Sequence, residues 1–296
     1  MSFLTGTSTS AATSEGTATA TPEVSPADIQ YIRALVREQA AIVVDETKTY
    51  LITTRLAPLL KRHGLTSLGE LVSRLRTSRL GGLRDEVVDA LTTNETLWFR
   101  DIHPFEALRS SILPELIRMR ASERALTIWS AACSSGQEPY TIAMMLREHF
   151  PHLADWRLRL VASDLSAEML GRAASGVYSQ TEMNRGLPAP MLVKYFQRTG
   201  TEWQAIESIR SMVEFRTLNL AKPWPVVPQC DVIFLRNVLI YFDMDTKRAI
   251  LDRARAALRP GGVLFLGTAE TTLGVHNGFI PKRHGSATVY HTNQEV

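Results

Sequence analysis

Leu126-Thr-Ile-Trp-Ser-Ala-Ala-Cys-Ser-Ser-Gly-Gln-Glu-Pro-Tyr140 is the stretch of sequence that decides the fold. Its first part is apolar, as expected for a strand that is covered on both faces of a parallel sheet. The residues from Ala131 to Gly136 are nearly all small, so a ligand can approach the backbone. Pro139 suits the first turn of a helix, whose free N–H groups and positive dipole end then face the loop. The stretch predicts a nucleotide-cofactor cradle of the Rossmann type, although it lacks the spaced glycines of a dinucleotide fingerprint.

Strand and helix patterns alternate from Leu126 onward, which is typical of an α/β domain with a doubly wound parallel sheet. The expected strands are Leu126–Ala131, Leu158–Ser163, Val213–Thr217, Val232–Leu235, Val263–Gly267 and Thr288–His291. A helix over Lys247–Leu258 is expected to end at Arg259-Pro-Gly-Gly262, which we interpret as a turn into the next strand.

The rest of the chain divides by composition. Residues 1–25 are mostly Ser, Thr, Ala and Gly, which predicts a disordered tail. From residue 26 to 91, apolar residues recur at intervals of three and four, which predicts an all-helical N-terminal domain. We assign residues 92–105 to a linker and residues 106–296 to the α/β domain.

Composition argues against several classes of protein. The formal net charge of +3 is too small to indicate a nucleic-acid partner. The two cysteines, Cys133 and Cys230, are isolated and indicate neither a disulfide framework nor a metal site. No apolar run is long enough to span a bilayer, and the N-terminus lacks the features of a signal peptide. We therefore expect a cytoplasmic protein without a metal, a nucleic-acid partner or membrane insertion.

Two acidic residues indicate which cofactor the cradle holds. Asp164 ends the second expected strand, where a carboxylate can accept hydrogen bonds from two ribose hydroxyls. An equally open alternative, on this residue alone, is that Asp164 caps the helix that begins near Ser166. Glu138 would repel a pyrophosphate but suits the ammonium group of an amino acid. S-adenosylmethionine carries an ammonium, a sulfonium and a ribose and has no phosphate, so these charges favour it over NAD.

A second apolar strand carries polar residues to the same edge of the sheet. In Asp231-Val-Ile-Phe-Leu-Arg-Asn-Val-Leu-Ile-Tyr-Phe-Asp243, the strand is followed by Arg236, Asn237 and Tyr241. Ligands bind at the carboxyl ends of strands in open α/β sheets. Capping of the following helix would explain the aspartates but not Asn237.

Four motifs, in this order, resemble those of the CheR family of chemotaxis receptor methyltransferases. They are Leu91-Thr-Thr-Asn-Glu-Thr-Leu-Trp-Phe-Arg-Asp101, Ala131-Ala-Cys-Ser-Ser-Gly-Gln-Glu-Pro-Tyr140, Arg236-Asn-Val-Leu-Ile-Tyr-Phe-Asp243 and Leu258-Arg-Pro-Gly-Gly262. The match runs from about residue 26 to the C-terminus. The resemblance implies transfer of the methyl group of S-adenosylmethionine to glutamate side chains on the cytoplasmic signalling domain of chemoreceptors, which leaves S-adenosylhomocysteine.

The resemblance also implies the residues of the site. Linker residues 92–105 are expected to fold over the cofactor, and Asn219-Leu220 to border its adenine. The cofactor-binding residues that it implies are Asn94, Thr96, Arg100, Glu138, Asp164, Asn219, Leu220, Asn237 and Val238. Arg100 and Tyr241 are implied to lie closest to the reacting centre. Without the resemblance, the segment Asn94–Arg100 would pass for the start of an interdomain helix with Asn94 as its N-cap.

The reaction asks little of the protein beyond positioning. A glutamate is already ionised at neutral pH and the sulfonium is a good leaving group, so no strong base is needed. Alignment of the reactants can supply about 7–11 kcal/mol. Our hypothesis is that Arg100 orients the attacking carboxylate and that Tyr241 lines the methyl-transfer channel.

Lys48, Arg55 and Arg62 are seven residues apart and would share one helix face. A basic face suits the Glu-rich methylation region of a receptor, and the family docks substrate through its N-terminal helices. The alternative is an ordinary solvated charged face. Pro58 could kink the helix.

Residues 178–211 interrupt the α/β pattern, and family members place a small antiparallel β-subdomain here. In some members it binds a pentapeptide at the receptor's C-terminus. The stretch Thr199–Arg210 is shorter and poorer in glycine than in those relatives, so we expect tether-independent activity.

Other functions predict other features. A methyltransferase for RNA or a small molecule would need neither the helical domain nor the Asn94–Arg100 segment. A cofactor-binding scaffold module would lack Arg100 or Tyr241, and a DNA-binding regulator would carry a dense basic face. We expect a monomeric enzyme.

Overall fold

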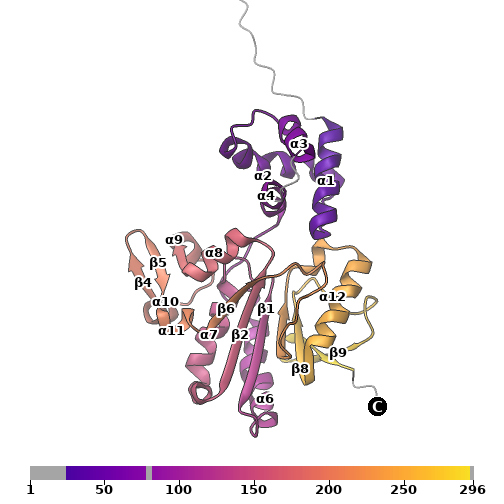
Figure 1. Cartoon of the computed structure of the whole chain (residues 1–296). Coiled ribbons are helices and arrows are strands. Elements are labelled where there is room, and N and C mark those ends of the chain that lie inside the picture. Colours follow the sequence, from indigo (N-terminus) through magenta and orange to yellow (C-terminus); the bar gives the residue numbers. More distant parts are fainter. Residues whose placement is uncertain (1–24, 78–81, 294–296) are drawn as a thin grey trace, which may run out of the picture.

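The structure is a computed structural model that describes residues 25–77 and 82–293. The tail expected over residues 1–25 therefore lies outside the described residues, apart from Ser25. A helical part stands over the end of a large sheet at which the parallel strands finish (Figure 1). None of the helices in the described ranges is long and apolar enough to cross a membrane.

The helical part has a small core of its own. Its elements are α1 (Pro26–Ala40), η1 (Glu46–Lys48), α2 (Thr49–Arg62), α3 (Leu68–Thr77) and α4 (Gly82–Leu91). The residues that gave the three-and-four pattern, among them Ile32, Ile52 and Leu56, are fully buried against one another. Pro58 lies inside α2, which continues through it to Arg62. The sequence prediction of an all-helical N-terminal domain is confirmed.

The main sheet has seven strands in the order β6-β2-β1-β7-β8-β10-β9. The strands are β1 (Ala125–Ala131), β2 (Arg157–Asp164), β6 (Val213–Thr217), β7 (Cys230–Leu235), β8 (Leu258–Leu266), β9 (Phe279–His284) and β10 (Ala287–Thr292). Pairs from β6 to β8 are parallel, whereas β10 runs antiparallel to β8 and β9. This order is the doubly wound, Rossmann-like fold that the sequence predicts.

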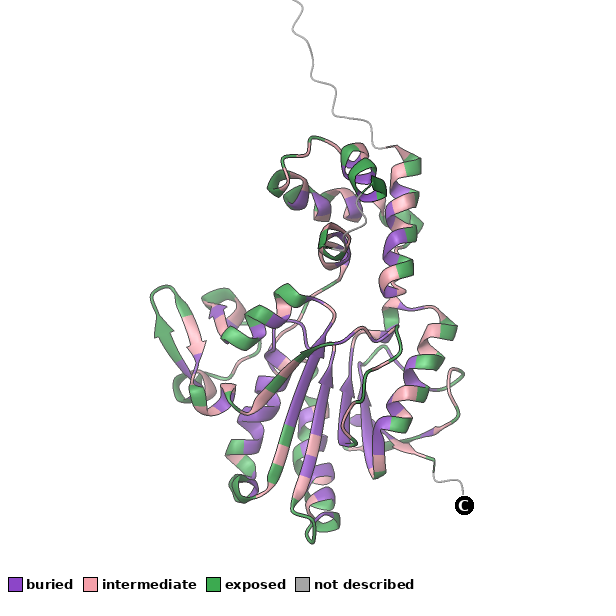
Figure 2. Ribbon diagram, in the orientation of Figure 1, coloured by how far each residue is buried: buried purple, intermediate pink, exposed green. Residues whose placement is uncertain are grey.

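Helices cover both faces of the sheet, and the central strands β1 and β7 are largely buried (Figure 2). The helical elements are α5 (His103–Ala107), η2 (Leu108–Ile112), α6 (Leu113–Met119), α7 (Gln137–His149), η3 (Pro151–Asp155), α8 (Ala167–Ser175), η4 (Leu239–Tyr241) and α12 (Met244–Ala257). Alternate residues of β1 enter opposite cores: Ile128 packs on the face of α7, and Trp129 packs on the face of α12. This alternation is why the strand has no polar side.

A three-stranded antiparallel sheet, in the order β3-β5-β4, is inserted between α8 and β6. Its elements are β3 (Val177–Ser179), α9 (Gln180–Met183), α10 (Ala189–Tyr195), β4 (Phe196–Thr199), β5 (Glu202–Ala205) and α11 (Glu207–Arg210). This is the antiparallel insertion that the resemblance implied. Figure 1 shows it beside α8, away from the C-terminal strands.

One prediction about the sheet is wrong. Residues 259–262 do not form a turn between a helix and a strand, because α12 ends at Ala257 and β8 begins at Leu258. The pairing of β8 with β7 jumps from Leu258–Cys230 to Val263–Val232. The Pro-Gly-Gly sequence is therefore accommodated as an irregularity within the strand.

Candidate functional site

The site lies where the strand order reverses. The chain proceeds outward from β1 to β2 and β6, and then returns to β7 on the other side of β1. In open α/β sheets this switch point opens a crevice beyond the carboxyl ends of the strands. A cavity of about 910 Å³ lies there. Its lining includes every residue that the sequence assigned to cofactor binding or catalysis: Asn94, Thr96, Arg100, Glu138, Asp164, Asn219, Leu220, Asn237, Val238 and Tyr241.

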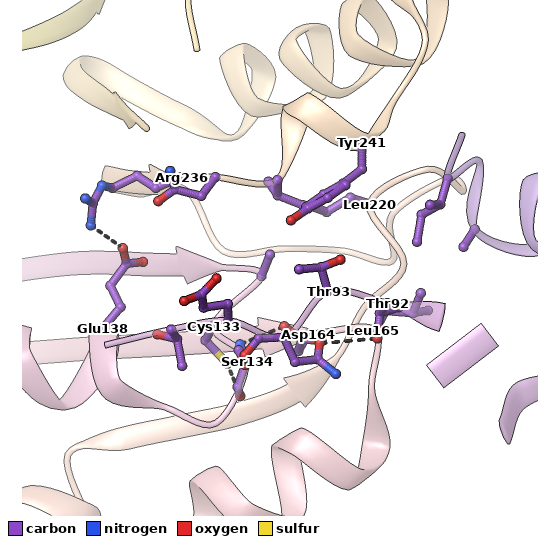
Figure 3. Close-up of a pocket in the computed structure, with 18 of the residues that line it drawn as sticks. Thr92, Thr93, Cys133, Ser134, Glu138, Asp164, Leu165, Leu220, Arg236 and Tyr241 are labelled. Carbon is purple, nitrogen blue, oxygen red and sulfur yellow. Dashed lines mark hydrogen bonds and ion pairs between the residues drawn. The ribbon is translucent and has the colours of Figure 1, made fainter. Parts of the chain in front are cut away.

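The small-residue loop after β1 forms one wall of this cavity. Ala132 and Ser134 have positive φ angles of 61° and 50°, which non-glycine residues adopt rarely and mostly at functional sites. The backbone N–H of Ser134 donates to Oδ2 of Asp164 at 2.7 Å. The loop and the end of β2 are therefore fixed to each other, as Figure 3 shows.

Asp164 lies at the base of the cavity, buried except for 7% of its surface. Its Oδ1 accepts the N–H of Ser166 at 2.9 Å. Ser166, rather than Asp164, caps α8 with its own side chain. Burial raises the pKa of the Asp164 carboxyl above its usual value, against the opposing effect of the backbone hydrogen bonds. Each carboxylate oxygen keeps one lone pair for a ligand.

At the other end of the cavity, two carboxylates share one guanidinium. Arg236 donates to Oε2 of Glu138 and to Oδ2 of Asp101, both at 2.8 Å, and Figure 3 shows the pair with Glu138. Ser130 donates to the second oxygen of Glu138 at 2.7 Å. The side chain of Arg236 is 2% exposed. With all three groups ionised, this cluster carries a net charge of −1, which suits a cation.

The linker folds over the cavity as an irregular segment. No helix begins at Asn94, so the capping alternative for this residue is wrong. The carbonyl of Asn94 accepts a hydrogen bond from Ser134 Oγ at 2.9 Å. Phe99, Asp101 and Ile102 all have positive φ. The segment is thus held to the β1 loop in a backbone conformation that needs support.

That support comes from the antiparallel insertion. Trp98 is fully buried and packs edge-on against Tyr178 and Phe196, with ring centroids at 4.9 and 5.2 Å. The backbone N–H of Trp98 donates to the carbonyl of Arg185 at 3.1 Å. The guanidinium of Arg100, two residues on, donates to the carbonyl of Glu95 at 2.9 Å while the residue lines the cavity.

The end of α1 closes the cavity from the helical part. Ala40 and Ile42 belong to its lining. Asn219 Nδ2 donates to the carbonyl of Gln39 at 2.8 Å, and its Oδ1 accepts the N–H of Ala221 at 2.9 Å. Both polar ends of Asn219 are therefore engaged within the protein. A contact between Asn219 and adenine would therefore be a van der Waals contact rather than a side-chain hydrogen bond.

The three basic residues assigned to substrate docking lie apart from this cavity. Lys48 precedes α2 and is exposed. Arg62 is exposed and pairs with Glu86 at 3.4 Å. Arg55 is half-buried and donates to the carbonyls of Leu91 and Thr92 at 3.0 and 3.1 Å. Arg55 and Arg62 line one groove, which meets the main cavity at Thr92 and Asn94.

Two residues of the site were not assigned by the sequence. Arg236 was placed at the edge of the sheet, but its pairing with Glu138 and Asp101 was not predicted. Glu270 was missed altogether, although its carboxylate binds the loop that follows β7. Nothing in the local sequence around Glu270 distinguishes it from a surface glutamate.

Comparisons with known proteins agree with this geometry. A family model described as the CheR methyltransferase all-alpha domain matches residues 27–92. A second, described as the CheR methyltransferase SAM binding domain, matches residues 94–286.

Several curated proteins are similar over most of their length. Chemotaxis protein methyltransferase 1 of Pseudomonas aeruginosa is 48% identical over 82% of this chain and 90% of its own. Chemotaxis protein methyltransferase Cher2 of Pseudomonas putida is 44% identical over 84% and 91%. Among solved structures, the match to a DhpI–SAH complex covers 65% of this chain and 71% of that chain, at 18% identity and a TM-score of 0.30.

Proposed function

Because the chain belongs to the CheR methyltransferase family, we propose that it methylates glutamate side chains of chemoreceptors to form methyl esters, with S-adenosylmethionine as donor. The observation that carries the proposal is the single cavity at the switch point of the sheet, lined by all the residues that the family motifs nominate. The proposed place of action is the cytoplasm, on the signalling domain of the receptors. We expect a monomer that acts without a metal or nucleic acid.

The charged groups of the cavity suit the proposed cofactor. Asp164 at one end has free lone pairs for two ribose hydroxyls. The cluster of Glu138, Asp101 and Arg236 at the other end has a net negative charge for an ammonium or a sulfonium.

Positioning is the main contribution that this chain can make to the reaction. The donor, when bound, supplies a methyl group on a positively charged sulfur. A glutamate oxygen attacks the methyl carbon, the carbon–sulfur bond breaks and its electron pair stays on sulfur. Opposite charges are neutralised in this step, so a site that held both charges too tightly would slow it. Arg100 is proposed to hold the incoming carboxylate through its guanidinium, and Tyr241 to border the path of the methyl group.

The proposal is tested by incubating the protein with methyl-labelled S-adenosylmethionine and a receptor signalling fragment. We expect label on the receptor that is released by mild base, because methyl esters hydrolyse there and N-methyl groups do not. A separate calorimetric titration with S-adenosylhomocysteine tests the cofactor site alone. Binding without receptor methylation would leave a cofactor-binding module. Label on RNA would indicate another substrate class.

We also propose that activity does not depend on a receptor-tail pentapeptide. The hairpin of the insertion is short, with β4 and β5 joined by Gly200 and Thr201. We expect no heat of binding when such a peptide is titrated, and equal methylation of receptors with and without the tail. Measurable peptide binding would contradict this expectation.

A further inference from the structure

Glu270 is a buried carboxylate that lies outside the cavity yet is bonded to one of its walls. The residue follows β8, is 8% exposed, and is not part of the lining. Its carboxylate accepts hydrogen bonds from the four successive N–H groups of residues 237–240, at N···O distances from 2.7 to 3.3 Å. It accepts a fifth from the N–H of Gly267 at 2.7 Å. One side chain therefore satisfies most of a loop's donors.

The conformation of this loop explains why it needs an acceptor. Asn237 has a φ of 58°, and the 3-10 helix η4 begins two residues later. The first N–H groups of a helical turn have no partner within the turn. Here the N–H groups of residues 237–240 all point toward the Glu270 side chain. Among side chains that could stand there, only an ionised carboxylate offers about four acceptor lone pairs. A glutamine would offer one acceptor oxygen and would turn its own N–H₂ group toward these donors.

The backbone at Gly267 packs closely against both Glu270 and this loop. A Cβ on Gly267 would lie 2.8 Å from both the backbone nitrogen of Asn237 and Oε2 of Glu270. Real Cβ atoms do not approach neighbours that closely. Only glycine fits where β8 ends, and its absent side chain lets the carboxylate reach the loop.

The loop that Glu270 holds carries Asn237, Val238 and Tyr241 of the cavity wall. On its outer side, the carbonyl of Tyr241 accepts the N–H of Val43 at 2.9 Å. The loop is thus fixed from the sheet by Glu270 and from the helical part by the segment after α1.

We propose that Glu270 is a positioning residue for the methyl-transfer site: its carboxylate holds residues 237–240 so that Asn237, Val238 and Tyr241 face the cofactor. This inference rests on the proposed function, since it assigns a purpose to the same cavity. Glu270 touches neither cofactor nor substrate in this assignment and acts through the loop alone.

The test compares Glu270→Gln with wild type in three measurements. We expect hydrogen exchange at the amides of residues 237–240 to accelerate, and the affinity for S-adenosylhomocysteine to fall by at least about tenfold, because several charge-assisted hydrogen bonds are lost. Circular dichroism should show the same secondary structure. The matched control is Asp245→Asn, which removes a 94% exposed carboxylate at the start of α12 and should change neither quantity.

Glu270→Asp provides a second test in case the Glu270→Gln variant does not fold. Its carboxylate is withdrawn by one methylene, so we expect intermediate exchange and affinity. Wild-type protection and affinity in either folded variant would overturn the proposal. If the wild-type protein itself fails to bind S-adenosylhomocysteine, the proposed function fails, whereas amide exchange still decides whether Glu270 holds the loop.

Discussion

Asp164 accepts two backbone hydrogen bonds before any ligand arrives, and burial raises the pKa of its carboxyl. The residue is thus both a structural acceptor and the proposed partner of the ribose. Only the ionised form can accept all of these hydrogen bonds. The pH dependence of ligand binding should therefore report its titration.

We expect affinity for S-adenosylhomocysteine to weaken as the pH falls toward the raised pKa of Asp164, at a pH above the ordinary aspartate value of 3.8. The free energy of unfolding should not fall with pH in the way that the ligand affinity does. Because the folded state binds this proton more tightly than the unfolded state does, protonation of Asp164 favours folding at low pH. Calorimetric titrations across this pH range, with thermal melts as control, separate the two effects. Affinity that is independent of pH would argue against contact with the ribose.

Arg100 and Tyr241 are expected to affect turnover more than cofactor binding. Arg100→Ala should lower kcat/KM for receptor by about 100-fold, the usual effect of misplacing a reactant. Tyr241→Phe keeps the ring and should cost about tenfold if the hydroxyl makes one hydrogen bond near the reacting atoms. Steady-state kinetics measure both. Near-normal rates with intact cofactor binding would refute these roles.

Single residues were predictable where a strand delivers them. Glu138 and Asp164 follow buried strands at the carboxyl edge, and a sequence displays that position directly. Glu270 could not be found this way, because four of its five hydrogen-bond partners lie 30 or more residues earlier and all five are backbone groups. The shared guanidinium of Arg236 depends on a positive φ at Asp101, which no local pattern encodes.

At the scale of elements, the linker over the cavity is fixed by the antiparallel insertion. Gly186, in the loop between α9 and α10, has a φ of 95°. A Cβ at this position would collide with the carbonyl oxygen of Trp98. The insertion therefore has a structural role whether or not it binds a receptor tail.

Gly186→Ala is expected to destabilise the protein more than Gly200→Ala. Both positions have positive φ, which costs an alanine about 1–2 kcal/mol. Nothing lies within 4 Å of a Cβ on Gly200, so only Gly186→Ala adds a clash, at about 1–3 kcal/mol more. Denaturant unfolding measures the difference. Equal losses would show that the linker moves aside freely.

The sequence predicted every strand of the main sheet except β9, which lies at one edge. The central strands β1 and β7 are largely apolar runs, as strands buried on both faces of a parallel sheet require. The edge strand β9 was missed because Pro281, Lys282 and Arg283 give it the composition of a loop, which is typical of an edge strand. The Pro-Gly-Gly sequence predicted a turn, but pairing on both sides draws it into β8 as an irregularity.

At the scale of the molecule, the proposed docking of a receptor on the basic residues of the helical part requires that their side chains are accessible. Arg55 is bonded to the end of α4 and to the linker, whereas the side chain of Arg62 is 61% exposed. Charge reversal at Arg55 would therefore change the stability of the protein as well as any receptor binding, and the two effects could not be separated.

We expect Arg62→Glu to raise the KM for receptor at low salt while changing the free energy of unfolding by no more than about 0.5 kcal/mol. The effect should shrink as salt screens the charges. Arg248→Glu is the matched control, because Arg248 is an ion-paired arginine on α12 whose side chain is 50% exposed. Unchanged receptor methylation in Arg62→Glu would remove this residue from the docking face. Arg55→Glu should lower stability by about 1–3 kcal/mol.

The order of the helical part and the α/β part along the chain could be predicted from the sequence, but the contacts between the two parts could not. The composition separates a helical block from an α/β block. The hydrogen bond from Asn219 to the carbonyl of Gln39 joins residues that are 180 positions apart, and local patterns do not report such pairs.

Ala40 and Ile42 from the helical part share the cavity with Asp164 and Asn237 from the sheet. Occupancy and the alignment of the two parts are therefore thermodynamically linked, and such linkage is reciprocal. A partner that stabilises the packing of the helices against the sheet must therefore raise the affinity for the nucleoside, by the same factor by which the nucleoside raises the affinity for that partner. A receptor that binds the helices would in this way set how firmly the enzyme retains its methyl donor.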